Sequence, residues 1–246
     1  MEIVVLAEEY VFDNPPGVIV ELVIDRETKR LMTRYEMLRL PTHLSYPAII
    51  RKGADIFVYP ENGASGTLCI YRYDEVNHKL VDPQCVHNEA LFDATIYQKA
   101  NGSCLMVATK QPDNLENAHL FCAPSFKGPF SQIGKKPFQP NRGCARMAGN
   151  FFEAFGQLYR PAQDCVSRYG AGTAIMEFDT ATNKEQKIFT LRPQSYKYNL
   201  GLHTINFHDG ICVIDGYGYL YPTLGRLYAS KKVERIRKFA KSIFRK

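Results

Sequence analysis

Four segments of the chain share one pattern, in which an apolar run, a polar turn and a second apolar run follow one another. They span residues 43–61, 92–110, 145–164 and 201–216. Their turn glycines are Gly53, Gly102, Gly156 and Gly210, which lie 49, 54 and 54 residues apart. Apolar runs rich in β-branched and aromatic residues on both sides of such turns are typical of β-hairpins. The pattern therefore predicts one hairpin in every 50 residues or so.

Further strand candidates lie between these hairpins, in residues 67–81, 118–130 and 173–189. About four strands in roughly 50 residues is the repeat of a β-propeller blade. At the N-terminus, residues 2–10 (EIVVLAEEY) read as a strand that ends in acids, and residues 17–32 as an outer hairpin. We therefore predict an all-β, five-bladed β-propeller, whose first blade lacks its opening strand and whose last blade is cut short. The alternative is a β-sandwich with accidental spacing.

The C-terminal residues 229–246 predict a basic amphipathic helix, which follows a propeller domain of residues 1–228. The apolar positions at helical spacing are Val233, Ile236, Phe239, Ala240, Ile243 and Phe244. Residues 231–246 carry eight Lys or Arg and one Glu, a local charge of +7. A basic helix with one apolar face is typical of binding to an anionic membrane surface. The alternative is a helix that packs its apolar face on the propeller or on a second subunit.

Charge and cysteine content narrow the class of protein. The whole chain has a net charge of +6, so residues 1–230 are close to neutral without the tail. A nucleic-acid-binding surface would spread basic residues over the fold, and we therefore expect no nucleic-acid partner. The seven cysteines contain no C-x-x-C pair, and the first residues lack a basic signal-peptide region. These features favour reduced thiols in a cytoplasmic protein.

In a propeller the first strand of each blade lines the centre, so polar residues at the ends of these strands converge there. The residues that fit are Glu9, His43, Glu61, Asp93, Arg146, Arg160, Gln163, Asp164, His203 and Asp215. Arginines can grip a phosphate or carboxylate, and Asp93 or Asp164 can accept sugar hydroxyl hydrogens or act as a base. Tyr46 and Tyr159 can stack on a sugar face.

Each of these residues also has a structural alternative. Asp93 and Asp164 can cap turns or hold an Arg inside the channel, Arg160 and Asp164 can form an ion pair, and Glu61 can be a turn residue. Two histidines with an Asp could hold a metal, but their spacing is long-range. No Gly-rich phosphate loop or H-E-x-x-H motif is present in the sequence. We therefore expect neither a metal nor a cofactor.

Several stretches carry a resemblance to a known family: HLSYPAII…DIFVYPE, LFDATIY, LFCAPSFKGPF, YRPAQDC…YG and GLHTINFHDG…VIDG. Over about residues 5–220 the chain resembles the five-bladed propeller domain of glucosamine inositolphosphorylceramide transferase-like proteins. That domain is similar in architecture to family 43 glycoside hydrolases. Those enzymes take a base Asp, an auxiliary Asp and an acid Glu from the inner strands of their first three blades.

This chain departs from the hydrolase pattern at the positions that the resemblance aligns. The opening strand that would carry the base is missing, the second blade offers His43 and Ser45, and the third offers Asp93. The fourth and fifth blades offer Arg146 and His203. The hydrolase set is therefore not reproduced.

We expect a carbohydrate-active propeller of a cell-surface glycan pathway, which binds a sugar and could also transfer or hydrolyse it. The expected catalytic residues are Asp93, Asp164 and His203. The expected substrate-binding residues are His43, Ser45, Tyr46, Glu61, Arg146, Arg160, Gln163 and Asp215. The expected partner is a sugar, a sugar nucleotide or a lipid-linked glycan, and the expected location is cytoplasmic, peripheral on the inner face of the membrane. The alternative is a non-catalytic sugar-binding or partner-binding propeller.

Overall fold

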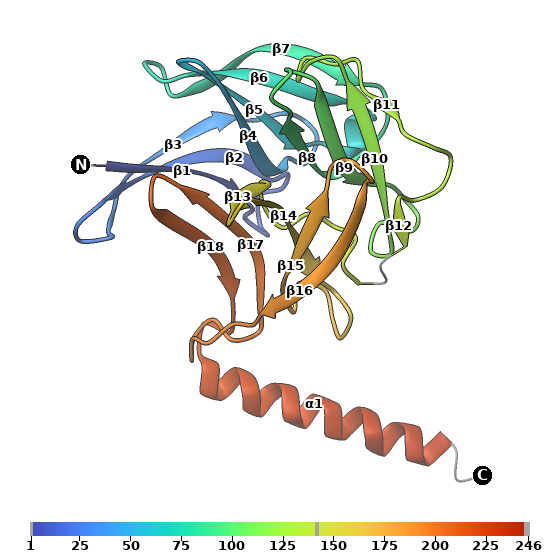
Figure 1. Cartoon of the computed structure of the whole chain (residues 1–246). Coiled ribbons are helices and arrows are strands. Elements are labelled where there is room, and N and C mark those ends of the chain that lie inside the picture. The colour runs from blue at the N-terminus through green and yellow to red at the C-terminus, as the bar shows by residue number, and fades with distance from the viewer. Residues whose placement is uncertain (1, 141–142, 244–246) are drawn as a thin grey trace.

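The computed structural model describes residues 2–140 and 143–243, which form β-sheets and one C-terminal helix (Figure 1). The first sheet contains β1 (Glu2–Glu9), β2 (Val18–Asp25) and β3 (Leu31–Leu38). The second contains β4 (Ser45–Lys52), β5 (Asp55–Glu61), β6 (Leu68–Asp74) and β7 (Lys79–His87). A short 3-10 turn, Gly63–Ser65, connects β5 to β6.

The third sheet contains β8 (Phe92–Gln98), β9 (Cys104–Thr109), β10 (Asn117–Ala123), β11 (Ser131–Gln132) and β12 (Gln139–Pro140). The fourth contains β13 (Phe152–Ala154), β14 (Gln157–Asp164), β15 (Gly172–Asp179) and β16 (Lys184–Leu191). The last is the two-stranded pair of β17 (Gly201–His208) and β18 (Ile211–Tyr217). In Figure 1, β1, β4, β8, β13 and β17 lie toward the middle of the molecule, whereas β3, β7 and β16 lie toward its outside.

The four predicted glycine turns join the first two strands of four successive sheets. Gly53, Gly102, Gly156 and Gly210 all have positive φ, between 61° and 86°. A residue without a Cβ adopts this conformation at little cost, which explains why glycine ends each apolar run. The all-β propeller fold predicted from this repeat is confirmed.

The predicted count of five blades is wrong. Over the described ranges the chain forms four sheets of three or more strands and one two-stranded hairpin. The last unit stops at a hairpin because the chain after Tyr217 turns into a helix instead of returning as a third strand.

The first sheet differs from the others in the direction of its inner strand. Glu8, near the end of β1, lies beside His43, which is two residues before the start of β4. β1 therefore ends at the level where β4 begins, so it runs in the opposite direction. This direction agrees with the prediction that the opening strand of the first blade is missing.

The apolar core lies between neighbouring sheets. One cluster joins the second and third sheets through side chains such as Tyr59, Ile70, Met106 and Phe121, all of them buried. The packed sheets hold the starts of the inner strands in fixed positions, because close-packed interiors deform little.

The helix α1 (Pro222–Ile243) begins seven residues earlier than the sequence predicted. Proline suits the first turn of a helix, where its missing N–H would have no helical partner. Among the described residues no helix is long and apolar enough to cross a membrane. Of the predicted helical residues, 244–246 lie outside the described part of the chain.

Candidate functional site

Four polar side chains from three sheets meet where the inner strands begin. Asp93 lies at the start of β8, Glu61 ends β5, Arg146 precedes β13, and Gln163 lies on β14. The Arg146 guanidinium donates to Asp93 Oδ2, and Gln163 Nε2 donates to the same oxygen at 3.0 Å. Glu61 Oε2 accepts the backbone N–H of Asp93 at 2.7 Å and lies 3.5 Å from an Arg146 nitrogen. These contacts make one connected cluster, which we call the central cluster.

Irregular pairing at the start of three inner strands aims side chains toward this region. The register shifts between Ser45 and Ala48 in β4, between Phe92 and Thr95 in β8, and between Leu202 and Thr204 in β17. Tyr46, Asp93 and His203 lie within these shifts and have no paired residue on the neighbouring strand. Such bulges are common beside active sites, where they redirect a side chain out of the regular ladder.

Burial and neighbouring charges set the electrostatics of the central cluster. Burial raises the pKa of Glu61 to about 8, and the charge of Asp93 adds to this effect more than Arg146 opposes it. Burial works against the charged form of Arg146, but the Asp93 carboxylate outweighs it and raises the pKa of the guanidinium. Glu61 is therefore a carboxyl group that stays largely protonated at neutral pH, next to a fixed positive charge.

His43 joins the first sheet to the same region. The Gly17 N–H donates to His43 Nδ1 at 3.0 Å, so the hydrogen of the neutral ring is on Nε2, which lies 3.1 Å from Glu8. Burial raises the pKa of Glu8, and the carboxylates of Asp215 and Asp93 raise it further, whereas His43 lowers it. Glu8 comes from the first sheet, Asp93 from the third and Asp215 from the last.

An aromatic group flanks the central cluster. The Tyr169 ring lies 5.4 Å from the Arg146 guanidinium and 5.0 Å from the His203 ring. The Tyr217 ring also lies 5.0 Å from the His203 ring, and His203 Nδ1 is 3.7 Å from Asp215. Burial raises the pKa of Tyr169 to about 12, so its phenol stays neutral. These rings supply the flat apolar surface that can stack on a sugar.

His203 is packed tightly against a glycine. A Cβ on Gly170 would lie 1.9 Å from a ring carbon of His203, and Gly170 has φ +58°. His203 Nε2 is shielded from solvent and has no hydrogen-bond partner among the described residues. The position of the imidazole therefore depends on the absence of a side chain at residue 170.

Arg160 does not reach the central cluster. Its side chain is fully buried and forms a bidentate pair with Glu185, at 2.6 and 2.7 Å, and a hydrogen bond of 3.0 Å to the Cys144 carbonyl. Its predicted role in substrate binding is wrong, because Arg160 and Gln163 point to opposite faces of β14. The ion pair predicted as the alternative exists, but its partner is Glu185 instead of Asp164.

Asp164 and Tyr46 are held by the protein itself. The Asp164 carboxylate is buried and accepts from Arg192 at 2.7 Å and from the Val166 N–H at 3.1 Å. The Tyr46 hydroxyl accepts the Gly149 N–H and is hydrogen-bonded to Thr95, both at 2.9 Å. Tyr46 therefore links β8 to the segment that follows Arg146, whereas Asp164 is engaged with Arg192 and the loop after β14.

Of the remaining predicted residues, one lies at the edge of the central cluster and two have other partners. Ser45 pairs with Glu61 across β4 and β5, so it lies at the edge of the central cluster. Glu9 forms an exposed ion pair with Arg34, and Tyr159 stacks on Phe152 at 5.3 Å. Sequence reasoning missed Glu8, Tyr169 and Tyr217. Tyr169 belongs to the YG of the motif YRPAQDC…YG, which is the signal that could have found it.

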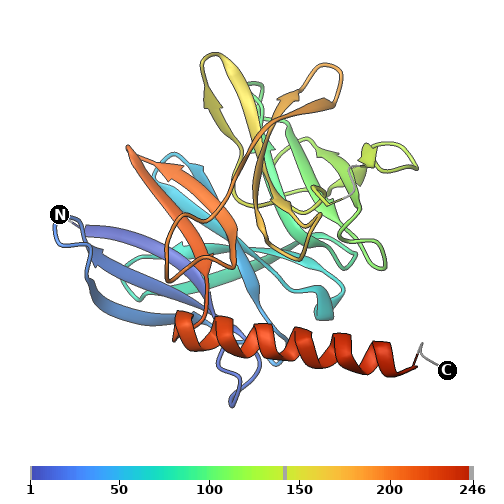
Figure 2. The same ribbon diagram turned by 90° about the horizontal axis from the view of Figure 1, so that it is seen from below.

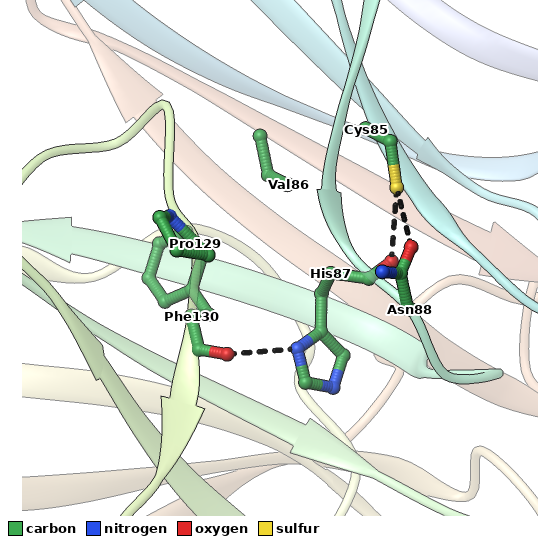
Figure 3. Close-up of a pocket in the computed structure, with 6 residues that line it drawn as sticks. All are labelled: Cys85, Val86, His87, Asn88, Pro129 and Phe130. Carbon is green, nitrogen blue, oxygen red and sulfur yellow. Dashed lines mark hydrogen bonds between the residues drawn. The ribbon is translucent and has the colours of Figure 1, made fainter.

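A separate hollow lies at the end of β7 (Figure 3). It is lined by Cys85, Val86, His87, Asn88, Pro129 and Phe130. Its polar groups bond to one another: His87 Nδ1 donates to the Phe130 carbonyl at 3.0 Å, and the Cys85 thiol donates to Asn88 Oδ1 at 3.0 Å. None of its lining residues belongs to the central cluster, which is the candidate site. Across residues 2–140 and 143–243, no three His, Cys, Asp or Glu side chains are placed to hold a metal ion.

The fold and the central cluster define this chain as a β-propeller protein with a polar site where its inner strands begin. Solved structures share the fold. The catalytic domain of a Coprinopsis cinerea GH62 α-L-arabinofuranosidase matches 88% of this chain and 82% of its own, with a TM-score of 0.65 and 9% identity. An exo-β-1,3-galactanase from Phanerochaete chrysosporium, solved with β-1,3-galactotriose, matches 87% of this chain and 49% of its own, with a TM-score of 0.60 and 11% identity.

Sequence comparison gives the family. Residues 36–204 match the family described as glucosamine inositolphosphorylceramide transferase 1, N-terminal, and the chain belongs to this family. The glucosamine inositolphosphorylceramide transferase 1 proteins of Oryza sativa subsp. japonica and Arabidopsis thaliana are each 27% identical to it, over 150 and 158 residues. Each match covers 59% of this chain and 20% of the relative, so the chain corresponds to about a fifth of the length of these proteins. The family and the fold point to a carbohydrate-related function.

Proposed function

We propose that this chain is a carbohydrate-active propeller that binds a sugar at the central cluster and takes part in the transfer or hydrolysis of a glycosidic bond. The observation that carries the proposal is the pairing of two buried carboxyl groups with different roles. Burial holds Glu61 largely protonated at neutral pH, while Arg146 and Gln163 hold the Asp93 carboxylate in place. The names of the relatives and structural neighbours, a glycolipid transferase and two glycosidases, support the same chemical class.

The two carboxyl groups fit the demands of glycosidic chemistry. A protonated carboxylic acid can give its proton to the oxygen of a departing group, and its raised pKa lets it do so near neutral pH. A carboxylate fixed by an arginine and an amide can accept hydrogens from sugar hydroxyls. The rings of Tyr169 and His203 can cover one face of the sugar. In this arrangement Glu61 is the proton donor, and Asp93 orients the substrate.

One observation favours the non-catalytic alternative. Asp93 Oδ2 accepts hydrogen bonds from both Arg146 and Gln163, so this oxygen is already occupied by groups of the protein. If no other group activates an acceptor or a water molecule, the cluster binds a sugar without reacting with it. This alternative retains the same site and the same ligand class.

The test compares two substitutions in the cluster with one on the same strand. Glu61→Gln removes a proton donor, and Asp93→Asn removes a negative charge. The control, Asp55→Asn, changes an exposed carboxylate at the opposite end of β5 from Glu61. Calorimetric binding and turnover should be measured with free sugars, sugar nucleotides and lipid-linked glycans. We expect Asp93→Asn to abolish binding, and Glu61→Gln to lower turnover by roughly 10²–10⁴-fold while binding remains.

Three results separate the alternatives. Binding without turnover by the unmodified chain identifies a binding module. Equal behaviour of the unmodified chain and both cluster variants, in binding and in turnover, overturns the proposal. Loss of binding in Asp55→Asn as well would show that the effect is not specific to the cluster.

The proposed partner is a sugar, a sugar nucleotide or a lipid-linked glycan of a cell-surface glycan pathway. The proposed location is the cytoplasm, peripheral on the inner face of the membrane. The free thiols of all seven cysteines support a reducing compartment. Fractionation of cells that produce the tagged chain tests the location.

A further inference from the structure

The segments that flank the last hairpin pack together beyond the end of that hairpin. Residues 194–200 lead into β17, and residues 218–227 follow β18 into α1. The Tyr196 hydroxyl is 2.7 Å from Thr223 Oγ1, and the Arg226 guanidinium lies 4.9 Å from the centre of the Tyr196 ring. A Cβ on Gly218 would lie 1.8 Å from the Lys197 carbonyl, so the two segments are in direct backbone contact there. They form one continuous surface.

Large apolar and aromatic side chains are exposed on this surface. They are Tyr196 (60% exposed), Tyr198 (47%), Leu220 (74%), Tyr221 (67%), Leu224 (65%) and Leu227 (54%). We call these six residues the terminal patch. Single exposed apolar residues are common on proteins, but a group of them in one place marks an interaction surface.

Basic residues continue the terminal patch along α1. Arg226, Lys231, Lys232 and Arg235 are exposed, and Glu234 is the acidic residue among them. By sequence, residues 231–246 carry a net charge of +7, whereas the rest of the chain is nearly neutral. The helix extends away from the last hairpin, below the sheets in Figure 1, and Figure 2 shows it from that side. The charge is therefore concentrated on one projecting element.

We propose that the terminal patch and the basic helix α1 form a docking surface for an anionic lipid bilayer. Tyrosine and leucine side chains beside lysine and arginine are the composition of protein surfaces that rest at the membrane–water interface. The concentrated positive charge is complementary to acidic lipid headgroups.

The docking surface lies at the same end of the propeller as the central cluster. β17 begins and β18 ends next to the terminal patch, and these strand ends carry His203 and Tyr217. The Tyr217 hydroxyl donates to the Tyr169 carbonyl at 3.0 Å, which connects the patch segments to the loop beside Arg146. A bilayer bound at the terminal patch therefore lies on the side of the molecule where the inner strands begin.

The test is flotation of the full chain with vesicles of phosphatidylcholine alone and of phosphatidylcholine with phosphatidylserine. We expect binding to the phosphatidylserine vesicles only, and weaker binding at higher salt. Leu224→Ser combined with Leu227→Ser should lower vesicle binding by more than roughly tenfold, because two apolar contacts with the bilayer are lost. Lys231→Gln combined with Lys232→Gln should lower vesicle binding by roughly thirtyfold.

Matched controls come from other exposed positions. Phe155→Ser changes an apolar residue that is 98% exposed at the β13–β14 turn, and Lys135→Gln with Lys136→Gln changes an exposed lysine pair. Both control variants should bind vesicles as the unmodified chain does. Because the substituted positions are exposed, every variant should fold. Circular dichroism of each variant checks this.

Three results overturn the inference. The first is a folded full chain that does not float with phosphatidylserine vesicles. The second is binding that neither double variant of the docking surface lowers. The third is a full chain that does not bind vesicles but self-associates in sedimentation velocity, with the self-association abolished by Leu224→Ser combined with Leu227→Ser. That result would mean that a second copy of the chain covers the terminal patch. Sugar binding is measured without lipid, so failure here is distinguishable from failure of the proposed function.

Discussion

At the scale of single residues, the protonation of Glu61 determines what the central cluster can do. The carboxyl is mostly buried and lies beside Asp93, so its pKa is raised from the ordinary value to about 8. An acid whose pKa is raised on folding binds its proton more tightly in the native state than in the unfolded chain. Its contribution to stability is present at low pH and falls as the pH rises from about 4.5 to about 8.

We predict that Glu61→Gln removes part of the pH dependence of stability. The free energy of unfolding of the unmodified chain should decrease by on the order of 5 kcal/mol between these pH values because of this group. Glutamine carries no proton to lose, so the variant should be more stable at the alkaline end and show a flatter profile. Urea unfolding of both chains at several pH values measures the free energy of unfolding across this range. A variant whose profile runs parallel to that of the unmodified chain would contradict the assigned protonation.

The sequence identified much of the central cluster, because the residues sit at the starts and ends of strands within a visible repeat. Asp93, Arg146, Gln163 and Glu61 were all found in this way and do come together. Arg160 was misplaced because its position three residues before Gln163 puts it on the opposite face of the strand. Its partner, Glu185, lies on the neighbouring strand at a distance in sequence that no local pattern reveals.

At the scale of elements, close approach between loops depends on individual glycines. Gly170 precedes β15 and lies against His203 of β17, with φ +58°. Gly53, in the β4–β5 turn, has nearly the same φ, +61°, but a Cβ there would meet nothing within 4 Å. The two positions therefore separate the cost of the backbone conformation from the cost of a steric clash.

We predict that Gly170→Ala destabilises the protein more than Gly53→Ala does. Alanine at Gly53 should cost about 1 kcal/mol, the penalty of a left-handed conformation for a residue with a Cβ. Alanine at Gly170 should cost at least about 2 kcal/mol more, because the His203 ring must move. Urea unfolding gives both values. Equal losses in the two variants would mean that His203 has room to shift, and that its position is not fixed by Gly170.

The boundaries of elements were less predictable than their existence. The hairpins were found because turn glycines and alternating apolar runs are local signals. The helix was predicted to begin at residue 229, where the basic amphipathic pattern becomes clear, but it begins at Pro222. Its first turns carry exposed leucines and are held by Tyr196 from another segment, a tertiary contact that periodicity does not show.

At the scale of the whole molecule, the described contacts join α1 to the sheets at its start. The side-chain contacts that hold the start of the helix involve Thr223 and Arg226. After these residues, α1 extends below the sheets (Figure 1). The stability of the propeller should therefore come from the packing between its sheets.

We predict that a chain that ends at Ser230 has the same melting temperature as the full chain, within about 2 °C. The deletion removes most of the basic residues of α1 but keeps the contacts of Tyr196. Differential scanning calorimetry of both chains measures the change. A drop of more than about 5 °C would show that the distal helix packs on the propeller and stabilises it.

The number of blades was the large-scale error. Regular spacing of turn glycines counts hairpins, and the last hairpin was counted as a fifth blade, although one that is cut short. A hairpin becomes a blade only if further strands pair with it, and β17–β18 has none among the described residues because the chain continues into α1. Spacing alone cannot show whether outer strands follow.

The backbone at the starts of β4 and β8 has a consequence for laboratory evolution. Tyr46 and Asp93 occupy corresponding places in neighbouring sheets, and both have positive φ, 42° and 46°. A side chain in this conformation costs stability, and glycine would relieve that cost. Replacement would, however, remove the hydrogen bonds of the Tyr46 hydroxyl to Gly149 and Thr95, or leave the Arg146 guanidinium without the Asp93 carboxylate. Libraries screened for heat resistance should therefore change residues 46 and 93 only together with these partners, and such paired replacements would show which contacts hold the strained backbone.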